Sequence, residues 1–178
     1  MVAAAINGNI TVHGLFPNSS QADVVILEAL RKTGVKLIVK DHSIAVSHSQ
    51  LNAFDFDASD CPDLFPPLAT LAAYCKGTSR IAGVGRLIYK ESNRAEAIRE
   101  EMGKLGIQIT IQEDDMFITG GKVRGATVNS HHDHRIAMMS AIAALGANAP
   151  ITIEHTECVE KSYPEFFQDL SKLGVLVE

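Results

Sequence analysis

The chain has 178 residues, enough for one domain with a sizeable hydrophobic core. Its 46% hydrophobic and 21% charged residues are typical of a soluble globular protein, and its net charge of -5 argues against a nucleic-acid-binding surface. No apolar run is as long as a transmembrane helix, and three cysteines follow no zinc or disulfide spacing. We therefore expect a cytoplasmic protein without membrane or nucleic-acid partners, in which local positive charge can still bind a small anion.

Helices and strands alternate along the whole chain. Apolar spacing with Gly and Pro at the ends predicts helices at residues 20–32, 63–77, 92–105, 133–146 and 163–173. Runs rich in β-branched residues predict strands at 10–12, 37–39, 44–46, 54–57, 79–83, 107–112, 116–119, 127–129, 151–154 and 175–177. Two pairs of these strands should form hairpins, over residues 37–46 and 107–119. The fold class predicted is α/β.

A glycine that ends a helix recurs about every 70 residues. Gly34, Gly106 and Gly174 each follow a helix with Lys near its end, and each leads into a predicted strand. Asp63 and Asp133 open two further helices at a similar spacing. Such periodicity predicts one domain, residues 1–178, built from about three pseudo-symmetric units with two helices and about four strands each. The chain should begin inside a unit, as a fragment of a longer protein.

Charged residues gather where helices are predicted to start. Residues 90–94, which include two cations, open the second long helix, Lys161 precedes the third, and Arg135 follows Asp133. If the units pack with pseudo-symmetry, these starts can meet at one end of the domain. Helix N-termini carry unpaired N–H groups, and Arg binds carboxylate or phosphate through two N–H groups at once. The pattern therefore predicts an anion site.

Simpler interpretations exist for each of these residues. Asp63, Ser92 and Asp133 could be helix N-caps only, and Lys161 an ordinary surface lysine. Glu91 and Arg94, three positions apart, could form an exposed ion pair of little energetic value. The histidine-rich run 131–134 suggests a metal site, but adjacent residues point in different directions, so we expect none there.

At these residues the sequence resembles the enolpyruvyl transferases, and within them the EPSP synthase (3-phosphoshikimate 1-carboxyvinyltransferase) family. The family's motifs appear in order as Pro62-Asp63, Lys90-Glu91-Ser92-Asn93-Arg94, Asp133-His134-Arg135-Ile136-Ala137 and Lys161-Ser162-Tyr163-Pro164. The resemblance covers essentially the whole chain, but only the C-terminal half of such an enzyme. It implies a domain of three βαβαββ units, which agrees with the repeat.

The resemblance implies transfer of enolpyruvyl from phosphoenolpyruvate to the 5-hydroxyl of shikimate 3-phosphate, with release of phosphate. This reaction belongs to the shikimate pathway, which leads to chorismate and the aromatic amino acids. Asp63 would accept the hydroxyl proton and touch the acceptor, Lys90 would be an acid/base residue on shikimate, and Glu91 would assist proton transfer. The phosphoenolpyruvate ligands implied are Arg94, Arg135 and Lys161. No metal or organic cofactor is implied.

The other half of such an enzyme would hold the acceptor's phosphate and close the site. We therefore expect the chain to be inactive alone and the full-length enzyme to be a monomer. Two departures affect the implied site. Asn93 stands where the family has Asp, which removes a carboxylate that could brace an arginine, and residues 86–89 replace a stretch that contains Asn in some members.

Two other functions remain to be compared with this one. The enzymes that transfer enolpyruvyl to UDP-N-acetylglucosamine share the fold and mechanism but lack the run at residues 90–94. A non-catalytic anion-binding module could reuse the fold, although such a module would need the cations and not the accompanying acids.

Overall fold

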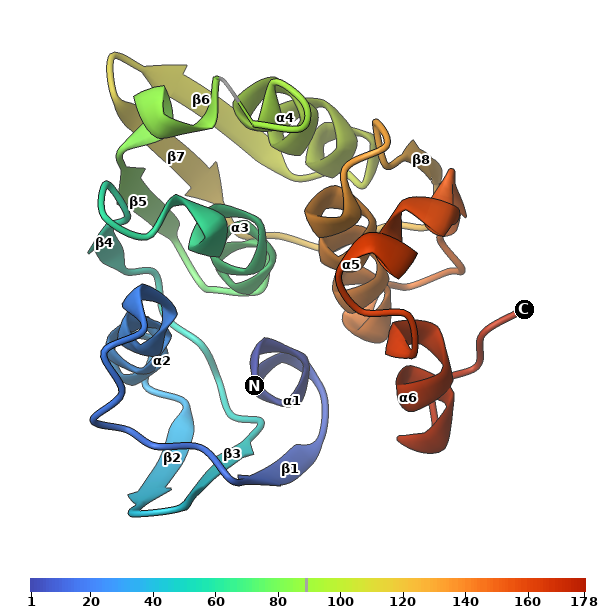
Figure 1. Cartoon of the computed structure of the whole chain (residues 1–178). Helices are drawn as coiled ribbons and strands as arrows, with labels where there is room; N and C mark the ends of the chain where they lie inside the picture. Colours follow the sequence, from blue (N-terminus) through green and yellow to red (C-terminus); the bar gives the residue numbers. More distant parts are fainter. Residues whose placement is uncertain (89) are drawn as a thin grey trace.

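The computed structural model describes residues 1–88 and 90–178, and its second unit shows the repeated order most completely (Figure 1). The elements of that unit are β4 (Asp55–Asp57), α3 (Phe65–Ala73), β5 (Thr78–Ala82), α4 (Arg94–Lys104), β6 (Gln108–Gln112) and β7 (Asp115–Thr119). Their order is βαβαββ. The predicted α/β class and the predicted repeating unit are therefore confirmed.

The flanking units supply parts of the same order. The first contains α1 (Val2–Ile6), β1 (Asn9–His13), α2 (Ile26–Thr33), β2 (Lys36–Lys40) and β3 (Ser43–Ser47). The third contains β8 (Thr127–Asn129), α5 (His134–Ala143), β9 (Thr152–Glu154) and α6 (Phe166–Lys172). Short 3-10 turns accompany them: η1 (Ala22–Val25), η2 (Pro62–Leu64), η3 (Val84–Leu87), η4 (Ala144–Gly146) and η5 (Thr156–Lys161).

The sheets repeat the same pairing. In the second unit β4 runs parallel to β5, and β7 lies antiparallel between β5 and β6. The first unit has the antiparallel part, β1-β3-β2, and the third has the parallel pair, β8-β9. Both predicted hairpins are present, as β2-β3 and β6-β7.

Helices α1, α3 and α5 pack on one another in the middle, with the sheets around them (Figure 1). In α3 every residue except Pro67 is buried, because this apolar helix has neighbours on all sides. A smaller cluster of buried side chains joins α5 to η5 and α6. Among the described residues, none of the helices combines the length and apolar character needed to cross a bilayer.

The three repeat glycines end helices as predicted. Gly34, Gly106 and Gly174 have φ angles of 79°, 86° and 92°, in the left-handed region that side chains with a Cβ rarely adopt. The strand predicted at residues 175–177 is wrong: no strand forms there, and Leu176 is 85% exposed. The last helix begins at Phe166 rather than 163, since Pro164 disfavours helical backbone at the residue before it.

The close packing between β7 and the end of α3 makes Gly120 intolerant of substitution. A Cβ at Gly120 would lie 1.8 Å from the carbonyl oxygen of Cys75, whereas one at Gly103, within α4, would meet nothing within 4 Å. We expect Gly120→Ala to lower the free energy of unfolding by about 1–3 kcal/mol or more. Gly103→Ala should raise it by about 0.5–1 kcal/mol through helix propensity. Urea denaturation of both variants tests this, and equal effects would contradict the packing described.

Candidate active site

Three helix starts, distant in sequence, meet around one group of charged side chains. Asp63 lies in η2, directly before α3; Arg94 is the first residue of α4; Asp133 is the N-cap of α5. Arg135 follows in the first turn of α5. The sequence predicts that Arg94, Arg135 and Lys161 converge, with Asp63 and Lys90 close by. The structure brings together all of these residues except Lys161.

Arg94 is the largest of the fully buried side chains, at 0% exposure. Its Nε donates to Asp133 at 2.9 Å, its Nη1 to Asp63 at 2.8 Å, and its Nη2 to Glu91 and to Asp133. A guanidinium has five N–H groups. Among the described residues, the bonds to these carboxylates leave one N–H of Arg94 without a partner.

Asp63 joins the cations to one another. Its Oδ1 accepts from Arg94 and lies 3.3 Å from Lys90 Nζ, while its Oδ2 accepts from Arg135 at 3.0 Å. Its side chain makes no helix-capping hydrogen bond, so the N-cap interpretation does not apply to it. Partial burial by itself would raise the pKa of Asp63. The charges of Arg135 and Lys90, with hydrogen bonds from Lys90 and Arg94, outweigh burial and hold this pKa below its usual value.

Asp133 has two roles at once. It caps α5 by accepting from the backbone N–H of Arg135 at 2.9 Å, and it pairs with Arg94 from a fully buried position. Ser92 adds a hydrogen bond to it at 3.2 Å. The side chain of Asn93 caps α4 by accepting from the N–H of Glu96. The Asp-to-Asn departure therefore does not leave Arg94 without carboxylates.

The group is electrically balanced. Three carboxylates, Asp63, Glu91 and Asp133, face three cations, Lys90, Arg94 and Arg135. The side chains of Lys90 and Arg135 are 28% and 30% exposed, so solvent and ligands can reach them. We call these six residues the charge cluster.

Lys161 is not drawn into the charge cluster. It is exposed at the end of η5, and it makes no ion pair or hydrogen bond within residues 1–88 and 90–178. It precedes α6 by a turn that contains Pro164, so it does not open that helix as expected. Arg86, in the other departure from the family pattern, is exposed in η3, and Tyr89 lies outside the described residues.

Sequence reasoning missed Glu101, which supports the loop before Asp133. Its carboxylate is fully buried near the end of α4 and accepts from Lys104, from the backbone N–H of Asn129 and from His131 Nε2. Burial alone would raise the pKa of Glu101, but these hydrogen bonds lower it below the usual glutamate value. The only sequence signal was an acid on the apolar face of a helix, beside Met102.

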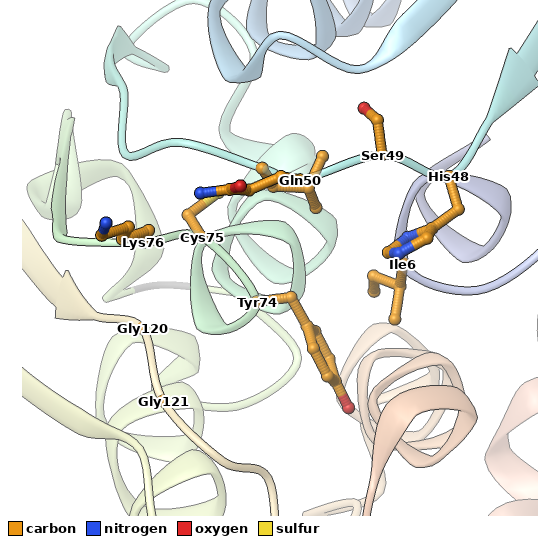
Figure 2. A pocket seen from close by; sticks show the side chains of 10 residues that line it. Ile6, His48, Ser49, Gln50, Tyr74, Cys75, Lys76, Gly120 and Gly121 are labelled. Atoms are coloured by element: carbon orange, nitrogen blue, oxygen red, sulfur yellow. The ribbon is translucent and has the colours of Figure 1, made fainter.

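A separate hollow lies at the other end of α3, away from the charge cluster (Figure 2). It has a volume of about 330 Å³ and is lined by Ile6, His48, Ser49, Gln50, Leu51, Tyr74, Cys75, Lys76, Gly120 and Gly121. His48 and Tyr74 bond backbone carbonyls of Ala5 and Ala143. Helix α3, about 13 Å long, separates it from Asp63. No acid and base converge there among the described residues, so the charge cluster is the better candidate.

Comparison with known proteins assigns the family. The family model described as EPSP synthase (3-phosphoshikimate 1-carboxyvinyltransferase) matches residues 1–170. The chain belongs to the EPSP synthase family. It is 43% identical to the 3-phosphoshikimate 1-carboxyvinyltransferase of Methanocella arvoryzae and 42% identical to that of Aeropyrum pernix, in each case over 100% of the chain. It spans 43% and 42% of the lengths of these family relatives.

Solved structures agree with this assignment. An EPSP synthase from Acinetobacter baumannii matches 99% of the chain with a TM-score of 0.86 and 29% identity, and 44% of that structure is covered. The enolpyruvyl transferase NikO from Streptomyces tendae matches with a TM-score of 0.73 at 20% identity, over 97% of this chain and 41% of its own. The latter likeness shows a shared fold.

Removing Arg94 should destabilise the protein strongly, because Arg94→Met leaves the buried Asp133 carboxylate without its counterion. We expect a loss of about 3–5 kcal/mol in the free energy of unfolding, measured with urea. Arg99→Met, at an exposed pair with Glu96, should cost less than about 1 kcal/mol. Adding Asp133→Asn to Arg94→Met keeps the cap and should recover part of the loss. Equal losses at Arg94 and Arg99 would contradict a buried ionic centre.

Stability should fall in acid. The pKa of Glu101 is lowered in the folded chain, so the unfolded chain, with a glutamate pKa of about 4.3, takes up its proton first. The contribution of Glu101 is therefore full above that value and is lost as pH decreases through the lower folded pKa. The urea concentration at the unfolding midpoint should decrease between about pH 5 and pH 3. The decrease should be less steep in the Glu101→Gln variant. Parallel slopes in the two proteins would show that Glu101 does not carry the effect.

Proposed function

We propose that residues 1–178 form one domain, the phosphoenolpyruvate-binding half of a 3-phosphoshikimate 1-carboxyvinyltransferase. The full-length enzyme would transfer enolpyruvyl to the 5-hydroxyl of shikimate 3-phosphate and release phosphate, in the shikimate pathway. The observation that carries the proposal is the convergence of Lys90, Arg94 and Arg135 on one carboxylate, Asp63, at three helix starts. Family membership makes this chemistry the first to test.

The partly exposed cations would make first contact with the substrate. Arg135 and Lys90 each reach solvent, and Arg135 holds Asp63 through two hydrogen bonds, to the side chain and to the backbone carbonyl. A carboxylate or phosphate of phosphoenolpyruvate can replace Asp63 as the partner of Arg135. Arg94 would present its remaining N–H while its other bonds keep Asp63 and Asp133 in place.

Substrate binding would then activate Asp63. Its pKa is held low partly by the charge of Arg135, so an anion that takes over Arg135 removes one cause of that lowering. A carboxylate with fewer counterions is a stronger base. Asp63 would accept the hydroxyl proton, while Lys90 and Glu91 would exchange protons with the substrate's methylene carbon. No step requires a metal or organic cofactor.

The neutral charge cluster explains why the chain should need its other half. Phosphoenolpyruvate is a multiply charged anion, and three cations balanced by three carboxylates bind it weakly. Lys161 and cations on the N-terminal half would supply the excess positive charge when the two halves close. That half would also hold the phosphate of the acceptor and exclude water, which positioning catalysis requires. We expect the full-length enzyme to be a monomer in the cytoplasm.

The rival functions are less well supported. A non-catalytic anion module would gain from cations alone, whereas the charge cluster carries as many carboxylates as cations. Transfer to UDP-N-acetylglucosamine would share the donor and the fold and differ in the acceptor. Binding of each acceptor distinguishes these possibilities.

The test is titration of the 178-residue chain with phosphoenolpyruvate, followed by amide chemical shifts. We expect binding at about 1 mM that weakens steeply with added salt, because exposed cations carry it. Arg135→Gln should weaken it at least about tenfold, the effect of losing one charge-assisted hydrogen bond. Shikimate 3-phosphate, but not UDP-N-acetylglucosamine, should strengthen binding in the full-length enzyme, where Lys90→Met should abolish turnover.

Arg99→Gln is the matched control, since Arg99 is an exposed arginine on α4 paired with Glu96. It should bind phosphoenolpyruvate as the parent does. The same loss in both variants would point to non-specific attraction. Robust turnover by the 178-residue chain alone, or near-normal turnover in full-length Lys90→Met, would overturn the proposed function.

A further inference from the structure

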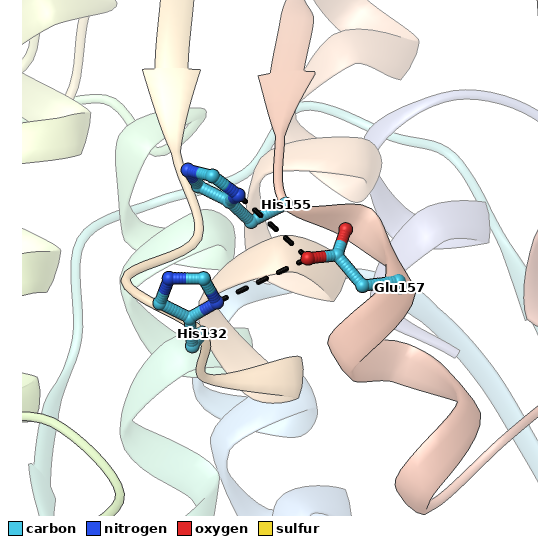
Figure 3. Close-up of side chains that lie close together, drawn as sticks. All are labelled: His132, His155 and Glu157. Carbon is cyan, nitrogen blue, oxygen red and sulfur yellow. Dashed lines mark ion pairs between the residues drawn. The ribbon is translucent and has the colours of Figure 1, made fainter.

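Outside the charge cluster, a second group of side chains contains potential metal ligands: His132, His155 and Glu157 (Figure 3). Their potential ligand atoms all lie within 4.8 Å of one another. His132 Nδ1 and His155 Nδ1 lie 4.0 Å and 3.7 Å from the same oxygen, Glu157 Oε1. All three side chains are exposed.

The backbone brings these residues together from separate segments. β8 and β9 are parallel, with Asn129 opposite Glu154, so the loops that follow them leave the same edge of the sheet. Ser130 ties the loops together: its Oγ donates to the carbonyl of His155 at 3.0 Å and accepts from the N–H of His132 at 3.1 Å. Both histidines have left-handed backbone, with φ of 56° and 60°.

Adjacent residues in the run 131–134 are not expected to bind one metal ion together, and the group formed here does not require it. His131 bonds Glu101 instead, so neighbouring residues of the run have different partners, and within it only His132 belongs to this group. The other two donors come from the loop after β9 and from the first turn of η5. Left-handed backbone at a residue with a Cβ is uncommon and costs energy. Two such histidines side by side, with their rings 4.4 Å apart, are a local feature that the proposed function does not use.

We propose that His132, His155 and Glu157 bind a divalent transition-metal ion of the Zn²⁺ type. Two imidazoles and a carboxylate are a donor set that suits Zn²⁺, with water completing the coordination. Metal–nitrogen bonds of about 2.0 Å in tetrahedral geometry place ligand atoms about 3.3 Å apart. The present separations are 3.7 Å and 4.0 Å from the two histidines to Glu157 and no more than 4.8 Å within the group, and rotation of these exposed side chains can shorten them.

The ion would connect two segments that matter for the proposed function. His132 directly precedes Asp133, in the charge cluster, and η5 runs from beside His155 to Lys161. Binding would therefore fix the loop before α5 against the segment that carries Lys161. The site itself stands on its own geometry and does not depend on the identity of the substrate.

The experiment is titration of the 178-residue chain with ZnCl₂, measured by calorimetry and by long-range ¹H–¹⁵N spectra of the histidine rings. We expect one equivalent to bind and two of the seven histidines to shift at Nδ1. Loss of even an outer-shell group costs about 10–100-fold in metal affinity, so His132→Ala and His155→Ala should each weaken binding at least about tenfold. Glu157→Gln should also weaken it.

Two controls test the position of the ion. His13→Ala removes an exposed histidine from β1 and should leave binding unchanged. Glu100, Glu101 and His131 form another group of possible metal ligands, so His131→Ala tests that location. Binding abolished by His131→Ala and retained by His132→Ala would overturn the proposal. Equal weakening by His13→Ala, or no binding of one equivalent by the parent chain, would also overturn it.

Discussion

The buried guanidinium of Arg94 is the interaction on which the candidate site depends. It bonds three carboxylates that come from the start of α3, the residues before α4 and the cap of α5. A fully buried charge is tolerated only when its N–H groups have hydrogen-bond partners of opposite charge. The three helix starts that supply these carboxylates must therefore stay in contact. The same contacts place Lys90 and Arg135, which remain partly open to solvent, beside Asp63.

Repetition of one structural unit makes that contact possible. Each unit contributes one helix to the centre of the fold, where α1, α3 and α5 pack together, and the pseudo-equivalent Asp63 and Asp133 both contact Arg94. The two positions have different roles in the structure. Asp133 is fully buried, caps α5 and pairs with Arg94. Asp63 is 35% exposed, and its side chain caps neither η2 nor α3.

Residues outside the charge cluster hold the loop that leads to Asp133. Glu101, at the far end of α4, holds the backbone of Asn129 and the ring of His131, and thereby the loop that leads to Asp133. Ser130 links the same loop to the end of β9. The candidate active site and the proposed metal site thus share one loop: Asp133 belongs to the charge cluster, and His132 belongs to the group with His155 and Glu157.

The sequence by itself determined the α/β class, the repeat, the hairpins and the family, since these rest on local periodicity, on glycines that need left-handed backbone and on contiguous motifs. It also predicted that Arg94, Arg135 and Asp63 would meet, as they do, and that Lys161 would join them, which it does not. Only the tertiary structure decided that Arg94 is buried, with one N–H left unpaired among residues 1–88 and 90–178, and that Lys161 lies apart from the charge cluster. It also decided that Glu101 bonds His131 and that His155 lies beside His132. Burial and pairing of a charge depend on segments far apart in the chain, and local sequence patterns carry no record of which of these segments come into contact.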